Sequence, residues 1–528
     1  MFALSSLGHR FTARSTLTLL LAFVACSDDD PLTAPVVPVP TTASELAGTW
    51  SLADSSVITT PAEQTVCQNR GVVTFTAGVI ETRGDVRIVG LCVSPRGRSI
   101  QTSQMEGDQV AVVGDSIAFT VSTTFGIIET CNYAGRLTGG SSLGASGSVT
   151  CSRGRTGTWQ LSWGLARPAV MGKLAMVDVA GGYTCALDVS GRVFCWGANG
   201  GGQLGTGDLL PRLVPASMNG DLRFTQISVA DNGAFTCGLT SAGQAYCWGN
   251  SFNGQLGDGS GPGEGTAVLD PKPVVGGHSF KQIVAAGGHT CALTTNGAAY
   301  CWGRNSLGQL GTGNDTPSSS PIPVSGDLTF RQIDAYTSNT CGVTTAGSAW
   351  CWGEGWSGIL GNGDDSDSDV PVPVSGGHTF TSVSVGLWMA CGVTTAGDGY
   401  CWGMGAEGLG TGTGTLESQA PVPVTGGLKW KSIRAGGFVA CGVTVTNVGY
   451  CWGQNVFGVL GIGITRENFN RPMPISGGLS FDHVMADFHA CGLTVDGVAY
   501  CWGDGSAGEV GDGYLRFRWE PVKVAGQP

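Results

Sequence analysis

Charged residues are scarce in this sequence. Asp, Glu, Lys and Arg make up 12% of its 528 residues, about half of the usual ~25%. A coiled coil or a long solvent-exposed helix needs many charged side chains, so both classes are excluded. Basic residues are the scarcer kind, because 27 Lys and Arg stand against 39 Asp and Glu, a formal net charge of -12. An acidic surface repels phosphate, so we expect no nucleic-acid partner.

Long hydrophobic runs are also missing. The run 17–25 is broken only by Thr18 and is too short to cross a bilayer, which takes ~20 residues. Arg10 and Arg14 precede it, which is the order of a secretory signal peptide. We therefore expect residues 1–25 to direct export, and no later segment to form a transmembrane helix.

The end of this run resembles a bacterial lipobox. Its sequence is Phe23-Val24-Ala25-Cys26, although the lipobox prefers Leu where Phe23 stands. The resemblance implies a lipid on Cys26, and the alternative is an ordinary signal peptide cleaved near Ala25. Residues 26–44 then form an extended, Pro-rich tether behind the lipidated cysteine.

Residues 45–165 show no useful helical periodicity. Short β-rich runs are separated by Gly, Asn and Asp turns, and several alternate apolar and polar residues, as half-buried strands do. We expect seven or eight short antiparallel strands in a small barrel or sandwich. Gly48-Thr49-Trp50 resembles the Gly-x-Trp of lipocalin-like barrels, with a plain core Trp as the alternative. Four cysteines indicate two disulfides of unknown pairing in an exported chain: Cys67, Cys92, Cys131 and Cys151.

Gly and Cys, in contrast, are abundant, with 88 and 19 residues. The triplet Cys-Trp-Gly recurs seven times, 50 to 54 residues apart, starting at Cys195, Cys247, Cys301, Cys351, Cys401, Cys451 and Cys501. A fixed period of this length predicts a solenoid or a propeller, because each unit buries its faces only against its neighbours.

A second cysteine precedes each triplet by ten residues, at Cys185, Cys237, Cys291, Cys341, Cys391, Cys441 and Cys491. Pairing Cys291 with Cys301 leaves residues 295–297 as a three-residue hairpin loop. The last position of such a loop needs a left-handed residue, and across the copies it holds six Gly and one Asn, which tolerate positive φ. Opposed residues have Cβ atoms ~4.5–5.5 Å apart, close enough to bridge. We expect one disulfide in each hairpin rather than a metal site, since this spacing is not a zinc pattern.

The repeats resemble those of the regulator of chromosome condensation family. Residues 288–293 (GHTCAL) and 305–311 (NSLGQLG) carry the family consensus most fully. The resemblance covers residues 166–528 and implies a seven-bladed β-propeller, so we expect an all-β protein with the propeller behind a small β domain. A Pro-Val strand follows every triplet, and the last one, Pro521–Val524, is expected to lie beside the hairpin Cys185–Cys195 and close the ring.

Catalytic patterns are missing from the whole chain. There is no ordered Ser/His/Asp set, no His-Glu-x-x-His and no phosphate loop, so we expect no enzyme activity, no metal and no cofactor. His289 and His489 share a repeat position at which the other copies hold Tyr, Phe, Asn, Met or Val, which favours a packed, hydrogen-bonded role. The acidic run 364–369 lacks the Gly and Glu of a calcium loop and indicates a solvated loop.

A Gly-rich turn follows each Cys-Trp-Gly triplet. Two neighbouring positions in it vary from copy to copy, while the residues around them repeat. They hold Phe252, Trp356 and Phe457 in three of the copies. Equivalent positions of a propeller lie on one face, so these aromatic residues form a candidate binding face. The alternative is that they fill gaps between blades.

These features favour a non-enzymatic binding or scaffold lipoprotein of the bacterial cell envelope. It would touch the membrane only through its lipid anchor, or else be secreted, and would present a propeller face to a protein or glycan partner. The resemblance adds guanine-nucleotide exchange on a small GTPase as an alternative, and inhibition of a secreted enzyme as another. Export and disulfides place the chain away from such a GTPase.

Overall fold

The computed structural model describes the strands that lie within residues 48–162 and the chain from 169 to 527, except residues 232, 261–266, 406–408 and 465–466. The expected signal peptide, Cys26 and the tether 26–44 lie outside the described residues. Within the described part of the chain, no helix has the length and hydropathy needed to cross a membrane.

The first described unit is one antiparallel sheet in the strand order β4-β3-β2-β1-β9-β8-β7-β6-β5. Its strands are β1 (Gly48–Thr60), β2 (Glu63–Thr76), β3 (Arg83–Val93), β4 (Ser99–Thr102), β5 (Met105–Val113), β6 (Ser116–Thr123), β7 (Thr130–Thr138), β8 (Gly144–Cys151) and β9 (Thr156–Ser162). An antiparallel β unit was expected here, with one or two strands fewer. Its likeness to a lipocalin stays a prediction.

The register of this sheet selects a disulfide pairing that the sequence left open. Cys67 on β2 lies opposite Cys92 on β3, and Cys131 on β7 lies opposite Cys151 on β8. Opposed residues of neighbouring strands have Cβ atoms ~4.5–5.5 Å apart, near the separation of a disulfide. We expect the bonds Cys67–Cys92 and Cys131–Cys151. Mass spectrometry of peptides cut without reduction should recover these two linked pairs, and a Cys67–Cys131 link would contradict the pairing.

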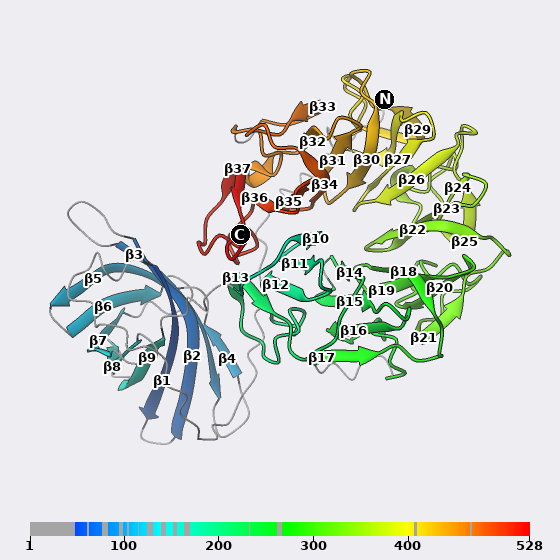
Figure 1. The fold of residues 1–528 in the computed structure, drawn as a ribbon. Coiled ribbons are helices and arrows are strands. Elements are labelled where there is room, and N and C mark those ends of the chain that lie inside the picture. Colours follow the sequence, from blue (N-terminus) through cyan, green and yellow to red (C-terminus); the bar gives the residue numbers. More distant parts are fainter. Residues whose placement is uncertain are drawn as a thin grey trace, which may run out of the picture.

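Seven four-stranded antiparallel sheets, the blades, follow one another around a ring (Figure 1). Each blade is built from four consecutive strands. Blades 1 to 3 are β10 (Leu174–Ala180), β11 (Tyr183–Asp188), β12 (Val193–Gly197) and β13 (Arg212–Ser217); β14 (Gln226–Val229), β15 (Phe235–Leu239), β16 (Ala245–Gly249) and β17 (Val268–Pro273); and β18 (Phe280–Ala285), β19 (His289–Thr294), β20 (Ala299–Gly303) and β21 (Ser318–Pro323).

The other four blades repeat this plan. They are β22 (Phe330–Tyr336), β23 (Asn339–Thr344), β24 (Ala349–Gly353) and β25 (Ser368–Pro373); β26 (Phe380–Val385), β27 (Met389–Thr394), β28 (Gly399–Met404) and β29 (Glu417–Pro423); β30 (Trp430–Ala435), β31 (Val439–Thr444), β32 (Gly449–Gly453) and β33 (Phe469–Pro474); and β34 (Phe481–Ala486), β35 (His489–Thr494), β36 (Ala499–Gly503) and β37 (Arg518–Lys523). Short 3-10 turns, η2 (Trp356–Gly358) and η3 (Val456–Gly458), follow the third strands of blades 4 and 6.

Each blade has the predicted hairpin between its second and third strands. The two cysteines are directly opposed in all seven hairpins, and each pair is disulfide-bonded with an S–S distance of 2.04 to 2.12 Å. The last loop residue has a φ between 63° and 90° in every blade, including Asn447. The turn residues therefore adopt the left-handed conformation that their identity predicts.

The Trp of each Cys-Trp-Gly triplet joins its blade to the preceding one. All seven of these side chains are fully buried. In blade 4, the Trp352 Nε1 donates a hydrogen bond to the Gln309 carbonyl of blade 3 at 3.0 Å. A Cβ on Gly311 would lie 2.7 Å from the same nitrogen, so the Gly-rich turn fits closely against the neighbouring Trp.

Pro521–Val524 was expected to lie beside the hairpin Cys185–Cys195, and Val524 does pack in one core cluster with Phe194 and Trp196 of that hairpin, but the segment does not pair with the hairpin as a strand. β37, which includes Pro521, pairs with β36 of its own blade, with Val522 opposite Cys501, and β13 completes blade 1. A strand that pairs with its predecessor closes a shorter loop, at a lower cost in chain entropy, than one that pairs across the ring. Blades 7 and 1 are joined instead by side chains, because the Trp196 Nε1 donates to the Glu509 carbonyl at 2.7 Å.

Candidate functional site

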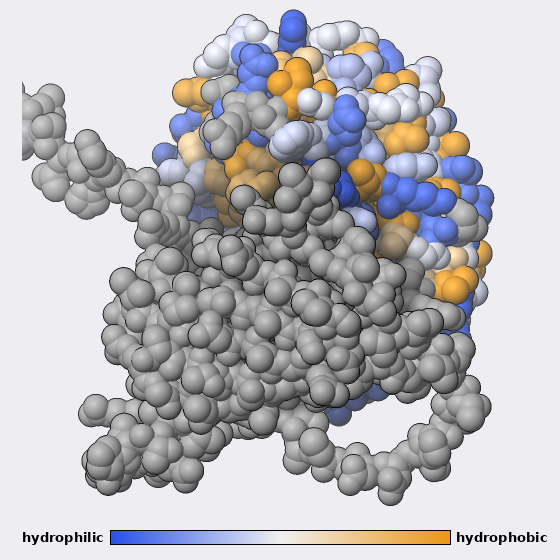
Figure 2. All heavy atoms as spheres, turned by 90° about the vertical axis from the view of Figure 1, so that its left-hand side faces the viewer, coloured by the Kyte–Doolittle hydropathy of each residue, from blue (hydrophilic) through white to orange (hydrophobic). Residues whose placement is uncertain are grey.

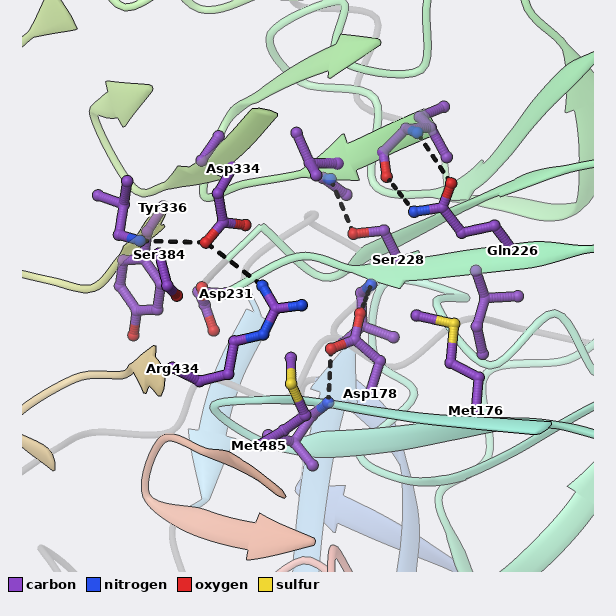
Figure 3. A pocket seen from close by; sticks show the side chains of 18 of the residues that line it. Met176, Asp178, Gln226, Ser228, Asp231, Asp334, Tyr336, Ser384, Arg434 and Met485 are labelled. Carbon is purple, nitrogen blue, oxygen red and sulfur yellow. Dashed lines mark hydrogen bonds and ion pairs between the residues drawn. The ribbon is translucent and has the colours of Figure 1, made fainter. Parts of the chain in front are cut away.

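The first strands of the seven blades surround a central cavity of about 290 Å³ (Figure 3). The residue opposite the first cysteine of each blade lines this cavity. Around the ring these residues are Asp178, Ser228, Val284, Asp334, Ser384, Arg434 and Met485. The position therefore differs in chemistry from blade to blade, although the backbone around it repeats.

Four polar side chains of this set accept hydrogen bonds from backbone amides of the next blade. Asp178 accepts a hydrogen bond from the Val229 amide, and Asp334 accepts one from the Val385 amide, both at 3.0 Å. Ser228 and Ser384 accept equivalent bonds. The first strand of a blade is an edge strand whose amides would otherwise lack partners. These side chains are therefore first of all structural.

Glutamine side chains clasp three neighbouring blade pairs in the same way. The Gln332 amide group donates to the Val383 carbonyl and accepts from the Val383 amide, each at 3.0 Å. Gln226 and Gln282 make the same double contact to the next blade. This repeated contact holds the inner strands of blades 2 to 5 at fixed spacing.

Three buried polar side chains meet beside the cavity from blades that are not neighbours. The Tyr336 hydroxyl of blade 4 donates to the Asp487 carboxylate of blade 7 at 2.9 Å, and Asp487 also interacts with Asp231 of blade 2. Burial, together with the Asp487 charge, raises the pKa of Asp231 well above its usual range. A shared proton lets two such carboxyl groups lie close together, so this cluster braces the ring.

Sequence reasoning missed this cluster. Counted from the residue opposite the first cysteine, Tyr336 and Asp487 share a repeat position at which the other five blades hold small residues, Ala180, Ala230, Ala286, Gly386 and Gly436. The available signal was the departure from these small residues, and it could be interpreted only once the ring brought the turns together.

Arg434 is the one Lys or Arg side chain among the residues that line the cavity. Arg434 lies 3.8 Å from Asp334 in a loose ion pair, and its side chain remains partly exposed. No group of three or more His, Cys, Asp or Glu among the described residues is arranged to hold a metal ion.

Asp178 should make stability depend on pH. Burial raises the pKa of its carboxyl to about 7, against about 4 in an unfolded chain. The stability from this proton is complete below pH 4 and is lost as the pH rises through 7. Between pH 6 and pH 8, the unfolding free energy of the wild type should fall by about 1 kcal/mol more than that of Asp178→Asn. Urea denaturation at both pH values measures this, and equal falls would contradict it.

The two repeat histidines are packed rather than exposed. The His289 Nε2 lies 2.9 Å from the Thr340 hydroxyl of the next blade, and the His489 Nε2 lies 2.6 Å from that of Thr184. Burial lowers the pKa of His289 to about 4 and that of His489 to about 3. Both are neutral links between blades, as their variable repeat position indicates.

Exposed hydrophobic residues are scattered among hydrophilic ones on the side of the propeller seen in Figure 2. Single exposed residues of this kind are normal and carry no functional signal. A group of exposed aromatic residues that contact one another is a stronger indication of a docking face.

The three candidate binding-face residues are exposed, as the surface interpretation requires. Phe252 is 58% exposed, Trp356 is 49% exposed and Phe457 is 37% exposed. They follow the third strands of blades 2, 4 and 6, and among the described residues no ring contact joins any two of them. Phe457 instead stacks on Phe517 of blade 7, with ring centroids 4.8 Å apart.

Trp356 belongs to an aromatic strip that crosses three blades, formed by Trp356, Trp388 and Phe438. The Trp356 ring packs edge-on against Trp388 of blade 5 at 5.4 Å, and Trp388 packs edge-on against Phe438 of blade 6 at 4.9 Å. Antiparallel strand order places the turn after a first strand and the loop after a third strand on the same face. The strip therefore lies on the candidate binding face.

Sequence reasoning missed Trp388 and Phe438. At their position in blades 1 to 3 the chain has small residues, Gly182, Ala234 and Gly288. The change from small to aromatic residues was the signal that could have found them.

Comparison with known proteins agrees with this architecture. The profile of the regulator of chromosome condensation (RCC1) repeat matches residues 190–237, 242–293, 296–342 and 346–393, and a second profile of this repeat matches 224–255 and 280–309. Among solved structures, human WBSCR16 is 20% identical with a TM-score of 0.56, over 63% of this chain and 93% of that protein. Yeast RCC1 (Prp20) bound to Kap60 is 19% identical with a TM-score of 0.57, over 64% and 84%.

Curated relatives match over shorter segments. The E3 ubiquitin-protein ligase HERC2 of Homo sapiens is 32% identical over 214 residues, which is 39% of this chain and 4% of HERC2. The ultraviolet-B receptor UVR8 of Arabidopsis thaliana is 34% identical over 182 residues, which is 32% of this chain and 40% of UVR8. The chain thus spans less than half of either relative. Residues 190–393 carry RCC1 repeats, and residues 169–527 fold as a seven-bladed β-propeller of this repeat type.

Proposed function

We propose that this chain is a protein-binding scaffold whose binding face carries the aromatic strip. The observation behind the proposal is the contact of Trp356 with Trp388 and of Trp388 with Phe438 on one face, where Trp356 is exposed and the other two are half-buried. Aromatic residues are enriched at the energetic centres of protein interfaces. The frame beneath the strip is rigid, because disulfides, buried Trp residues and glutamine clasps hold it.

Similar propellers support a protein partner. One of them, yeast RCC1, is described in complex with another protein, Kap60, and UVR8 is a receptor. The polar groups of the cavity mostly satisfy backbone amides, which favours binding rather than catalysis. HERC2 is a ligase, but the match covers too little of it to carry that activity over.

The scaffold would work outside the cytoplasm. Seven buried disulfides support an oxidising compartment, in line with the export signal expected in residues 1–25 and the lipobox-like Cys26. We therefore place the propeller on a tether at a bacterial membrane. Labelled palmitate should be incorporated by the wild type and not by Cys26→Ser, and labelling of both would overturn the anchor.

Photo-crosslinking tests the binding face. A photoreactive residue at position 356 should yield a discrete crosslinked product in the full chain in its native membrane. The matched control is position 495, where Val495 is similarly exposed in a hairpin turn on the opposite face. The same product from both positions, or none from position 356, would contradict the proposal.

A further inference from the structure

Blades 4 and 5 carry an unusual charge distribution. Residues 332–428 contain nine Asp and Glu and no Lys or Arg. This stretch holds Trp356 and Trp388, two of the three members of the aromatic strip. Within this stretch of sequence no basic side chain offsets the negative charge, and Arg304 of blade 3 is a cation that reaches Glu354 from outside it.

The acids are concentrated in the loop that presents Trp356. This acidic loop contains Glu354, Asp364, Asp365 and Asp367, and Asp369 follows in β25. The Asp367 carboxylate accepts a hydrogen bond from the Gly355 amide at 2.8 Å, next to Trp356. Burial and the Asp367 charge raise the pKa of Glu354, so these two carboxyl groups are close enough to repel each other.

The remaining acids of the loop face solvent. Asp364, Asp365 and Asp367 are exposed, as is Asp369 in β25. Asp367 is bonded to the Gly355 amide next to Trp356, whose side chain is about half exposed. An aromatic face attracts a cation through its ring electrons, and nearby carboxylates attract the same group. The two features therefore select for one kind of ligand, a positively charged side chain.

Other ligand classes fit less well. Phosphate-bearing molecules would be repelled by the loop. A neutral sugar could stack on the rings but would leave the exposed carboxylates unused. A metal ion would need converging ligands, and the described residues form no such group.

We propose that the aromatic strip and the acidic loop together dock a basic segment of the partner protein, one that carries arginine or lysine side chains. The inference rests on the proposed scaffold function and specifies its partner. Arginine should be preferred to lysine, because the planar guanidinium both stacks on Trp and pairs with a carboxylate through two hydrogen bonds.

A peptide titration tests this docking surface. The probe is a short, fluorescently labelled peptide of alternating arginine and serine, added to the oxidised full chain at low salt. We expect saturable binding that weakens as salt is added. The corresponding lysine peptide should bind more weakly, and the glutamate peptide should not bind.

Matched variants distinguish peptide binding at the proposed surface from nonspecific electrostatic attraction to an acidic protein. Trp388→Ala and the double variant Asp364→Asn with Asp365→Asn should each weaken the arginine peptide by roughly fivefold or more. Trp519→Ala removes a similarly exposed aromatic residue, 53% exposed, from β37 of blade 7 and should bind like the wild type. Asp221→Asn with Asp327→Asn removes two exposed acids from the connections on the opposite face and should also bind like the wild type.

The outcomes are distinct. Equal losses in the test and control variants, or equal binding of the glutamate peptide, would overturn the inference. The loop double variant keeps this result interpretable if Trp388→Ala lowers the melting temperature. If position 356 crosslinks a partner without a basic segment, the inference fails while the scaffold function stands; if it crosslinks nothing, the function itself fails.

Discussion

Reducing the seven propeller disulfides should unfold the ring at temperatures at which the oxidised protein stays folded. Each bond joins cysteines ten residues apart in sequence. The chain-entropy model assigns about 3 kcal/mol to a loop of this size. Two or three such bonds match the ~5–15 kcal/mol net stability of a typical domain, so losing all seven should be decisive.

The measurement has to allow for the burial of the sulfurs. All fourteen cysteines are fully buried, so a reductant reaches them only when the protein opens. The chain should be reduced in denaturant, returned to buffer with reductant, and compared by circular dichroism with a sample handled in the same way without reductant. A cooperative melt of the reduced sample at the oxidised temperature would contradict the prediction and would mean that packing alone holds the ring.

Two Trp residues four positions apart in sequence should respond to substitution in opposite ways. Trp352 is fully buried and bonded to the Gln309 carbonyl, whereas Trp356 is half exposed. Trp352→Ala should cost about 3–5 kcal/mol through the cavity it creates, with a further loss because a buried carbonyl is left unpaired. Trp356→Ala should change stability by less than about 1 kcal/mol.

Urea denaturation of the two variants makes this comparison, and Trp352→Phe serves as a control. The Phe variant keeps most of the buried volume and should lie between Trp352→Ala and the wild type. A loss for Trp356→Ala as large as that for Trp352→Ala would show that Trp356 is a core residue. In that case the candidate binding face would lose its central member.

The parts of the fold that could be predicted are those encoded within one repeat. The hairpin, its left-handed turn and the opposed cysteines all lie within a dozen residues, and seven copies repeat the same signal. The partner of the last Pro-Val strand could not be predicted in this way. Its choice between β36 and the first blade depends on the geometry of the whole ring, and the local pattern is compatible with both.

The candidate site residues also divide into those encoded within one repeat and those that depend on the assembled ring. Phe252, Trp356 and Phe457 were found because they vary at an aligned position. Trp388 and Phe438 lie at a different repeat position, so their contact with Trp356 exists only once the blades are assembled. The contact between Tyr336 and Asp487 crosses the ring between blades separated by 151 residues of chain, and no repeat pattern predicts it.

Because each blade consists of four consecutive strands, blades 1 and 7 meet without exchanging a strand. The Met171 amide donates to the Gly526 carbonyl at 3.0 Å, so both ends of the propeller lie at one boundary between blades. That boundary uses the same Trp-to-carbonyl hydrogen bond as five of the other boundaries. A circularly permuted chain, with these ends fused and a new opening in an outer loop, would keep every sheet and every disulfide intact.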